Sequence, residues 1–589
     1  MRLVHIMWPG MRMRWRTIAA IFVLQLGQII LSLWLPALNA DVIDTGILTR
    51  NESYIWRTGA LMFVITLIQF VASAAAIYFS SRASMEIGRD LRARAFRHVQ
   101  RFSAADQHRF GAPTLITRVT NDVQQIQMVI LLLFAIIVTA PMMGIGGLAM
   151  AIRQDSTLSL LLLIIVPALA VVIFFVMRAL LPRFAIVQQR IDRINTLLRE
   201  QLTGARVIRA FVRQPLEAQR FDEANRHLRS IHLQVGFIWS FFMPMVSVIV
   251  GLSAASVVYV GARRIEVGGM QVGSLSAFIS YLMMILGSVM MAGMMAMVLP
   301  RGDVSAARLK EILDTVPSIT APEEPLSLPS GRLSVDFDDV QLRFEEAENP
   351  VFSGISFHID PGTQFAIIGS TGSGKTSLVR LIPRLVDLTH GSVKVGGIDV
   401  RRLDPLKLRE RVAYIPQTSF LFSGTIASNV AGTLNERQID RPRVTKALDA
   451  AQAHDFVAGL DQGIDAPVEA GGKNYSGGQR QRIAIARAIY RCLPDATGTS
   501  QADVLIFDDS FSALDFQTDA ALRMNLPHYI GNIPVIIVAQ RVSTIRNADQ
   551  ILVLDAGHSA GLGSHNELMR SSQVYQEIVA SQLSAQEAQ

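Results

Sequence analysis

The sequence contains a single cysteine, Cys492, among its 589 residues. One cysteine cannot form a disulfide within the chain, and no other cysteine is present to share a metal site with it. Charge is also scarce, because Asp, Glu, Lys and Arg make up 17% of the residues while 50% are hydrophobic. This composition excludes a chain that is soluble throughout and predicts a large membrane-embedded part. The unpaired cysteine fits a reducing, cytosolic face.

Six stretches of roughly 20 residues or more carry almost no ionisable side chains, and each is long enough to cross a bilayer as a helix. They are residues 17–36, 58–80, 128–150, 157–181, 236–260 and 274–299, and no comparable stretch follows Pro300. The first is followed by further spans, so it predicts a retained helix rather than a cleavable signal peptide. The near-absence of carboxylates and histidines from these cores argues against a transporter built on a proton relay.

Arginines indicate the orientation in the membrane. Four precede the first stretch, eight lie within residues 82–127 and ten within 182–235, whereas the three other loops carry five basic residues together. By the positive-inside rule, the N-terminus and both long loops are cytoplasmic. An even number of spans returns the C-terminal part to the same side. The formal net charge of +7 is then a topology signal, and we expect no nucleic-acid partner.

Both long loops keep helical periodicity, which predicts membrane helices that extend well into the cytoplasm. Breaks around residues 103–116 and 212–216 suit either a short helix that presses on a cytoplasmic domain or a solvated connection. The sixth stretch is rich in methionine, with Met283, Met284, Met290, Met291, Met294, Met295 and Met297. Flexible thioethers form an adaptable apolar surface, which suits a hydrophobic substrate cavity or ordinary helix packing.

Changes of composition along the chain predict its domains. Residues 1–300 form a polytopic α-helical membrane domain, 301–331 a connector with four prolines, 332–583 a soluble domain and 584–589 a C-terminal tail. In the soluble domain, β-branched runs at 365–368, 504–507 and 535–538 alternate with helical patterns. This alternation predicts an α/β fold with a mainly parallel sheet and a ligand at the C-terminal ends of its strands.

The strongest motif is Gly369-Ser-Thr-Gly-Ser-Gly-Lys-Thr376, a complete G-x-x-x-x-G-K-[ST] phosphate-binding loop between a predicted strand (365–368) and a predicted helix (377–382). Glycines let the backbone wrap phosphate oxygens, the lysine reaches the β- and γ-phosphates, and the threonine hydroxyl suits Mg²⁺. The residues expected to contact the nucleotide are Gly369, Ser370, Thr371, Gly372, Ser373, Gly374, Lys375, Thr376 and Ser377. The soluble domain is therefore expected to be a P-loop nucleotide hydrolase.

Further features fit a nucleotide site. Asp508 ends the apolar strand at 504–507, where a carboxylate can hold the Mg²⁺ shell opposite the phosphate loop. Phe344, 25 residues before Gly369, is placed to stack on adenine. Downstream, Tyr475-Ser-Gly-Gly-Gln479 opens a helix and makes a second anion-binding terminus. Two phosphate sites in one domain suggest that sites are shared between domains.

Together these motifs resemble the ATP-binding cassette (ABC) transporter family, of the exporter type that fuses a membrane domain to a C-terminal cassette. The resemblance covers essentially the whole chain and is specific, because it joins a Ser-Gly-Gly-Gln signature to the phosphate loop and Asp508. Cassettes of this family pair head to tail, which implies that Ser476, Gly477, Gly478 and Gln479 cap ATP held by the partner. The resemblance further implies that Gln417 senses Mg²⁺ and the membrane domain, and that Ser512-Ala-Leu-Asp515 crosses the dimer interface. It also implies that Glu469 with Gly471 forms a cross-talk segment. The breaks around residues 103–116 and 212–216 would then be coupling helices.

Two positions depart from the family pattern, and both belong to one composite site. Asp509 stands where the family has its catalytic glutamate, and Gln540 where it has a switch histidine. Aspartate is one methylene shorter, and a misplacement of about 1 Å can cost on the order of 10²-fold in rate. Glutamine can hydrogen-bond a γ-phosphate but cannot carry the positive charge of imidazole. The signature is intact apart from Tyr475. The stretch from Ser476 to Asp508 is longer than the family pattern, and its extra residues, 493–501, are expected to form a polar surface loop.

These features predict a half-transporter of the cell membrane, with a cytoplasmic cassette that binds ATP and Mg²⁺ and hydrolyses ATP to export a drug-like or lipid-like substrate. Its expected partner is a different half-transporter that carries a true glutamate. Asp509, Gln540 and Gln417 are the candidate catalytic residues, and Thr376, Gln417 and Asp508 are the candidate metal ligands. Two alternatives stay open, namely an importer, for example of a siderophore, built on the exporter fold, and a regulatory membrane sensor that binds ATP without driving transport.

Overall fold

The computed structural model describes residues 2–344, 347–495 and 498–587, and it divides into two compact units. The first unit holds the chain up to residue 101 together with residues 110–316, and the second holds residues 102–109 together with the chain from residue 317 onward. The domain boundaries expected after residues 300 and 331 stay a proposal. The last two residues of the expected tail, 588–589, lie outside the described residues.

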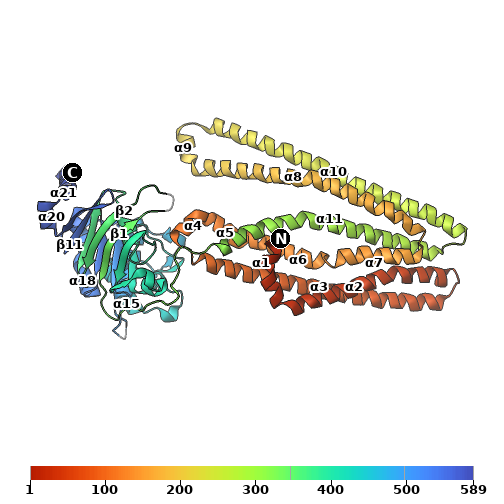
Figure 1. The fold of residues 1–589 in the computed structure, drawn as a ribbon, viewed down its shortest axis with the longest axis horizontal. Coiled ribbons are helices and arrows are strands. Elements are labelled where there is room, and N and C mark those ends of the chain that lie inside the picture. Colours follow the sequence, from red (N-terminus) through yellow and green to blue (C-terminus); the bar gives the residue numbers. More distant parts are fainter. Residues whose placement is uncertain (1, 345–346, 496–497, 588–589) are drawn as a thin grey trace. The chain divides into compact units, whose positions relative to one another are not determined.

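Six helical runs long and apolar enough to cross a membrane are found in the described part of the chain, as predicted (Figure 1). They are Trp15–Ile47, Glu52–Val99, Ala112–Gln154, Leu158–Thr203, Gln214–Glu266 and Val272–Asp314. Their elements are α2 (Trp15–Asp41), η1 (Val42–Ile47), α3 (Glu52–Val99), α5 (Ala112–Thr117), η2 (Arg118–Asp122), α6 (Val123–Ile136), α7 (Thr139–Gln154), η3 (Leu158–Leu161), α8 (Leu162–Thr203), α10 (Gln214–Glu266) and α11 (Val272–Asp314). At 1.5 Å per residue, α10 extends about 80 Å, far beyond the ~30 Å of a hydrocarbon core. The long helices therefore continue through the cytoplasmic loops.

A short helix interrupts each cytoplasmic loop. Helix α4 (Ala104–Phe110) falls within the first predicted break. In the second loop the helices are interrupted at residues 211–213, close to the break predicted at 212–216, but the short helix α9 (Ala205–Ala210) lies before this break rather than within it. The reason is local, because Val212 has a φ of +51° and Pro215 occupies the first turn of α10. Proline is favoured in a first turn, so the long helix starts there and the short one lies before it.

Helix α4 joins the second unit through a small polar cluster. The Asp106 carboxylate accepts hydrogen bonds from the main-chain amides of Ser103 (2.9 Å) and Ser318 (3.0 Å). In return, the Ser103 hydroxyl accepts from the Asp106 amide at 3.1 Å and from the Ser318 hydroxyl at 2.7 Å. Ser103 and Asp106 thus cap the start of α4 by accepting hydrogen bonds from each other's main-chain amides, and Ser318 donates to both of their side chains.

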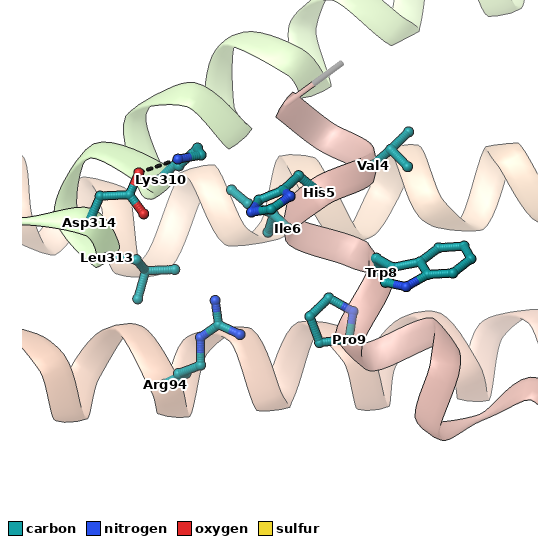
Figure 2. Close-up of a pocket in the computed structure, with 9 residues that line it drawn as sticks. All are labelled: Val4, His5, Ile6, Trp8, Pro9, Arg94, Lys310, Leu313 and Asp314. Carbon is teal, nitrogen blue, oxygen red and sulfur yellow. Dashed lines mark hydrogen bonds and ion pairs between the residues drawn. The ribbon is translucent and has the colours of Figure 1, made fainter.

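The first helix, α1 (Arg2–Met13), packs its apolar face, Leu3, Ile6 and Met7, into the first unit. The turn that follows is fixed by Arg14, whose guanidinium contacts Glu86 at 2.8 Å and Asp90 at 2.5 Å. Figure 2 shows the cavity of about 660 Å³ that opens between α1, α3 and α11. It is lined by Val4, His5, Ile6, Trp8, Pro9, Arg94, Lys310, Leu313 and Asp314, and Lys310 is paired with Asp314.

The second unit is an α/β domain with a six-stranded sheet in the order β12-β11-β3-β10-β9-β6. Its strands are β3 (Gln364–Gly369), β6 (Val412–Ile415), β9 (Val504–Asp508), β10 (Val535–Val538), β11 (Gln550–Asp555) and β12 (His558–Gly563). All neighbouring pairs are parallel except β11 with β12, which confirms the predicted mainly parallel sheet. Both faces of β9 are buried, as its uninterrupted apolar run requires.

A second, antiparallel sheet and the helices complete this unit. The sheet has the order β2-β1-β4-β5 and consists of β1 (Val335–Leu342), β2 (Phe352–Ile359), β4 (His390–Val395) and β5 (Ile398–Asp399), while β7 (Gly424–Thr425) pairs with β8 (Pro467–Val468). The helices are α12 (Lys375–Val379), α13 (Pro405–Arg411), α14 (Ile426–Ala431), α15 (Arg441–Ala450), α16 (His454–Ala458), α17 (Gly477–Cys492), α18 (Phe516–Ile530), α19 (Val542–Ile545), α20 (His565–Ser571) and α21 (Gln573–Glu587).

Cys492 and the extra segment 493–501 stand at the end of α17. Cys492 is buried, and this burial raises the pKa of its thiol to about 12, so the thiolate is strongly disfavoured. In the described part of the extra segment that follows, Pro494 and Ser500 form an antiparallel β-bridge, and residues 496–497 lie outside the described part.

Candidate ATP site

The parallel sheet brings the candidate residues to one edge. The phosphate loop follows Gly369, the last residue of β3, and Asp509 follows Asp508, the last residue of β9. Gln540 and Gln417 each stand two residues beyond the ends of β10 and β6. Because β6, β9, β10 and β3 are parallel neighbours, their C-terminal ends meet at one place, where α/β sheets bind ligands.

The phosphate loop has a backbone that only glycine allows at several points. Gly372 and Gly374 have φ angles of +89° and +92°, in the left-handed region. A Cβ at Gly369 would lie 2.1 Å from the Leu554 carbonyl oxygen of β11. The loop is thus pressed against the sheet. Helix α12 starts at Lys375, two residues earlier than predicted, and ends at Val379, before Pro383.

Two side chains of the loop are poised for an anion. The Lys375 ammonium donates to the carbonyl oxygens of Gly369 and Ser370, at 2.8 Å each. Burial lowers the pKa of Lys375, and the nearby carboxylates of Asp509 and Asp508 oppose that change. The Ser373 hydroxyl is buried and has no hydrogen-bond partner among the described residues. Since buried polar atoms are normally paired, this hydroxyl fits a loop built to receive phosphate oxygens.

Asp508 and Thr376, two of the residues expected to hold Mg²⁺, contact each other. The Thr376 hydroxyl donates to one carboxylate oxygen of the fully buried Asp508 at 2.7 Å. The Tyr414 hydroxyl donates to the other at 2.6 Å. A hydroxyl and a carboxylate supply the hard oxygens that Mg²⁺ takes beside nucleotide phosphates, so these residues fit the ion. Tyr414 was not predicted, because an aromatic residue in a strand carries no sequence signal of a long-range contact.

Asp509 is the meeting point of the two glutamines. One oxygen of its carboxylate, Oδ2, accepts from Gln417 Nε2 at 2.9 Å and from Gln540 Nε2 at 2.7 Å. Burial raises the pKa of Asp509, and the two amide donors oppose that rise. Its φ is +51°, a left-handed conformation that aspartate adopts more readily than most residues. Gln417 therefore hydrogen-bonds to Asp509, whereas Asp508 accepts hydrogen bonds from the hydroxyls of Thr376 and Tyr414.

The signature segment caps its own helix. The Ser476 hydroxyl accepts from the Gln479 amide, and the Gln479 side chain accepts from the Ser476 amide at 2.9 Å, which forms a capping box at the start of α17. A Cβ at Gly477 would have open space around it, whereas one at Gly478 would lie 3.3 Å from the Ala513 carbonyl oxygen. The N-terminal end of α17 is thereby held in a regular start, and the positive end of its helix dipole is a favourable place for an anion.

The remaining candidates lie around this edge. Phe344 follows β1 and is 45% exposed, which leaves its ring free to stack on a base. In the loop that follows Asp509, the Ser512 hydroxyl donates to the Asp509 carbonyl oxygen at 2.8 Å, and Asp515 caps α18 by accepting from the Thr518 main-chain amide. Just before the signature, Gly471 has a φ of +75° beside Glu469.

The first unit holds an apolar cavity of about 550 Å³ between α7, η3, α8 and α11. Its lining includes Gly144, Leu148, Ser159, Leu163, Ile285 and Ser288. On α11 the methionine-rich face is divided, because Met290 packs partly buried against the helix core while Met294 is 60% exposed. The described helices thus present apolar surface both in a cavity and on an open face.

Comparison with known proteins gives concordant matches. Residues 18–289 match the ABC transporter transmembrane region, and residues 352–511 match the ABC transporter model. The chain is 41% identical, over 96% of both chains, to an uncharacterized ABC transporter ATP-binding protein of Mycobacterium tuberculosis. It is 30% identical, over 84% of both chains, to the ATP-dependent lipid A-core flippase of Desulfotalea psychrophila. A bacterial Atm1-family ABC exporter solved with ATP bound has the same fold, with a TM-score of 0.79, 22% identity, and coverage of 97% of this chain and 98% of that one.

Proposed function

The chain belongs to the ABC transporter family as an exporter-type half-transporter that couples ATP hydrolysis to transport, and on this premise we propose that it forms a heterodimer in which it holds the slow ATP site. One observation carries the proposal: the position of the catalytic base is occupied by Asp509, whose carboxylate is already engaged by the Gln417 and Gln540 amides. The expected partner is a second half-transporter with a glutamate at that position.

Chemistry at this site supports a slow rate. A general base must reach the water that attacks the γ-phosphate, and aspartate is one methylene shorter than the glutamate of the family. Loss of a well-placed base typically costs about 10²- to 10⁴-fold. Gln540 can hold a phosphate oxygen by its amide but supplies no positive charge. Lys375, Thr376 and Asp508 nevertheless keep the groups expected for binding ATP with Mg²⁺, so nucleotide should be bound and retained.

The signature segment supports a competent second site. Ser476, Gly477 and Gly478 keep the small residues and the exposed helix terminus that an opposing ATP needs. In a head-to-tail pair they would cap the ATP held by the partner's phosphate loop, where the partner's glutamate acts. This chain would then contribute to fast hydrolysis through its signature and to slow hydrolysis through its own loop.

The proposed substrate is hydrophobic or amphipathic and lipid-like. The relatives named lipid A-core flippases support this class, as do the apolar cavity of the first unit and the exposed Met294. Flexible methionine side chains can adapt to more than one acyl or aromatic group.

The proposal is tested with the full chain purified alone in lipid nanodiscs. It should bind ATP but hydrolyse it about 10²-fold or more slowly than a transporter with a true base, because both sites of any homodimer would be slow. The Lys375→Ala variant gives the baseline without nucleotide binding. Rapid hydrolysis by the unmutated chain, stimulated by lipid or drug, would instead establish a homodimeric exporter that uses Asp509 as its base.

A further inference from the structure

The segment that carries Gln540 is held by the last helix of the chain. Helix α21 packs against α19, and the side chain of Gln582 reaches the main chain on both sides of Arg541. Its Nε2 donates to the Gln540 carbonyl oxygen at 2.8 Å, and its Oε1 accepts from the Val542 amide at 2.8 Å. One side chain therefore satisfies two main-chain groups of the segment that follows β10.

The position of Gln582 is set by the core. Tyr575 is fully buried, and its hydroxyl lies 2.8 Å from His565 Nδ1. Val579, one turn further along α21, is also buried. Residues 575, 579 and 582 follow the i, i+4, i+7 spacing of one helix face. The face that anchors α21 in the domain is thus the face that presents Gln582.

Gln582 also lies beside the ATP site. It lines a cavity of about 380 Å³ whose wall includes Asp509, Gln540, Thr544 and Ser581. The side-chain amide of Gln540 in turn donates to the Asp509 carboxylate. A continuous set of hydrogen bonds therefore runs from α21 through the main chain at residue 540 to the carboxylate in the position of the catalytic base.

We propose that Gln582 is a positioning residue for this chain's ATP site. By fixing the main chain at Gln540 and Val542, it keeps the Gln540 amide directed at Asp509 and at the side where the terminal phosphate of ATP would lie. The inference rests on the proposed function, in which Gln540 occupies the switch position. Without these two hydrogen bonds the segment remains attached to the sheet through β10, but the main chain at residues 540 and 542 is less restrained, and only the hydrogen bond to Asp509 then directs the Gln540 side chain.

The test compares Gln582→Met with Gln576→Met in the full chain. Methionine keeps the length of glutamine and removes its polar atoms, and Gln576 is an exposed residue of the same helix whose amide donates to the Met569 carbonyl oxygen instead. In Gln582→Met, hydrogen exchange at the Val542 amide should be about five- to tenfold faster, as expected for the loss of one ordinary hydrogen bond. Dissociation of bound ATP should be about tenfold faster, because a contact to the nucleotide is misplaced. Gln576→Met should change neither.

A second variant separates positioning from packing. Gln582→Glu keeps the shape of the side chain and the acceptor for Val542, but it sets a carboxylate oxygen against the Gln540 carbonyl oxygen, so ATP retention should fall about as far as in Gln582→Met. Normal ATP retention in Gln582→Met would overturn the positioning role. The same holds if only Gln582→Ala, which also removes the volume of the side chain, retains ATP poorly. Failure of the proposed function appears in a different measurement, namely rapid ATP hydrolysis by the unmutated chain purified alone.

Discussion

Lys375 bonds to the carbonyl oxygens of its own loop, and its burial disfavours the charged form. Phosphate oxygens would replace these carbonyls with stronger, charge-assisted partners. We therefore expect Lys375→Ala to weaken ATP binding to this chain by about 10- to 100-fold, the equivalent of one charged hydrogen bond. Photolabelling with an ATP analogue measures this loss, and Lys446→Ala, an exposed lysine of α15, is the control. Equal labelling of Lys375→Ala and the wild type would show that this loop does not bind the nucleotide.

Gly477 allows the sharing of sites to be tested without disturbing the fold. A side chain there has open space in this chain, so Gly477→Asp should leave thermal unfolding unchanged. In the heterodimer, however, its carboxylate would face the partner's ATP and should abolish most steady-state hydrolysis. Asp509→Asn should cost less, because it affects only the slow site. A larger loss in Asp509→Asn than in Gly477→Asp would mean that the two sites have the opposite roles.

At the scale of whole elements, the methionine face of α11 carries the prediction about substrate. Replacing Met290 and Met294 together with Glu places two carboxylates on a face that is apolar, at a cost of several kcal/mol if a hydrophobic substrate must lie there. Transport should stop while basal ATP hydrolysis persists. Met524→Glu, on an exposed position of α18, is a control outside the membrane. Unchanged stimulation of hydrolysis by lipid in the double variant would assign the face to packing.

The sequence predicted elements whose signal is local and missed those fixed by contacts distant in the chain. The six spans, the parallel strands and the loop from Gly369 to Thr376 follow from composition and short motifs, and the structure has them. The short helix of the second loop was misplaced, because Gly204 and Pro215 compete as helix boundaries. The contacts of Tyr414 with Asp508 and of Gln582 with Gln540 join residues 94 and 42 positions apart, and no pattern in the sequence announces them.

For the whole molecule, the proposed asymmetry predicts a gain of function. Asp509→Glu together with Gln540→His should raise hydrolysis at this chain's site within the heterodimer by about 10²-fold or more, because a base and a positive charge are restored. Transport need not rise, since an ATP that stays bound can keep the two cassettes partly joined. Single-turnover hydrolysis with a partner disabled at its own base isolates this site. No gain in the double variant would show that residues other than Asp509 and Gln540 limit the rate of ATP hydrolysis at this site.

The cluster of Ser103, Asp106 and Ser318 joins residues that the ribosome delivers at different times. Ser318 lies 212 positions after Asp106. At typical elongation rates of about 5–20 residues per second, helix α4 waits roughly 10–40 s before its partner emerges. During that interval four further membrane spans are inserted. Because Ser103 and Asp106 already bond to each other's amides, the start of α4 can remain formed through the delay, and the cytoplasmic domain then completes itself around a piece of chain made long before it.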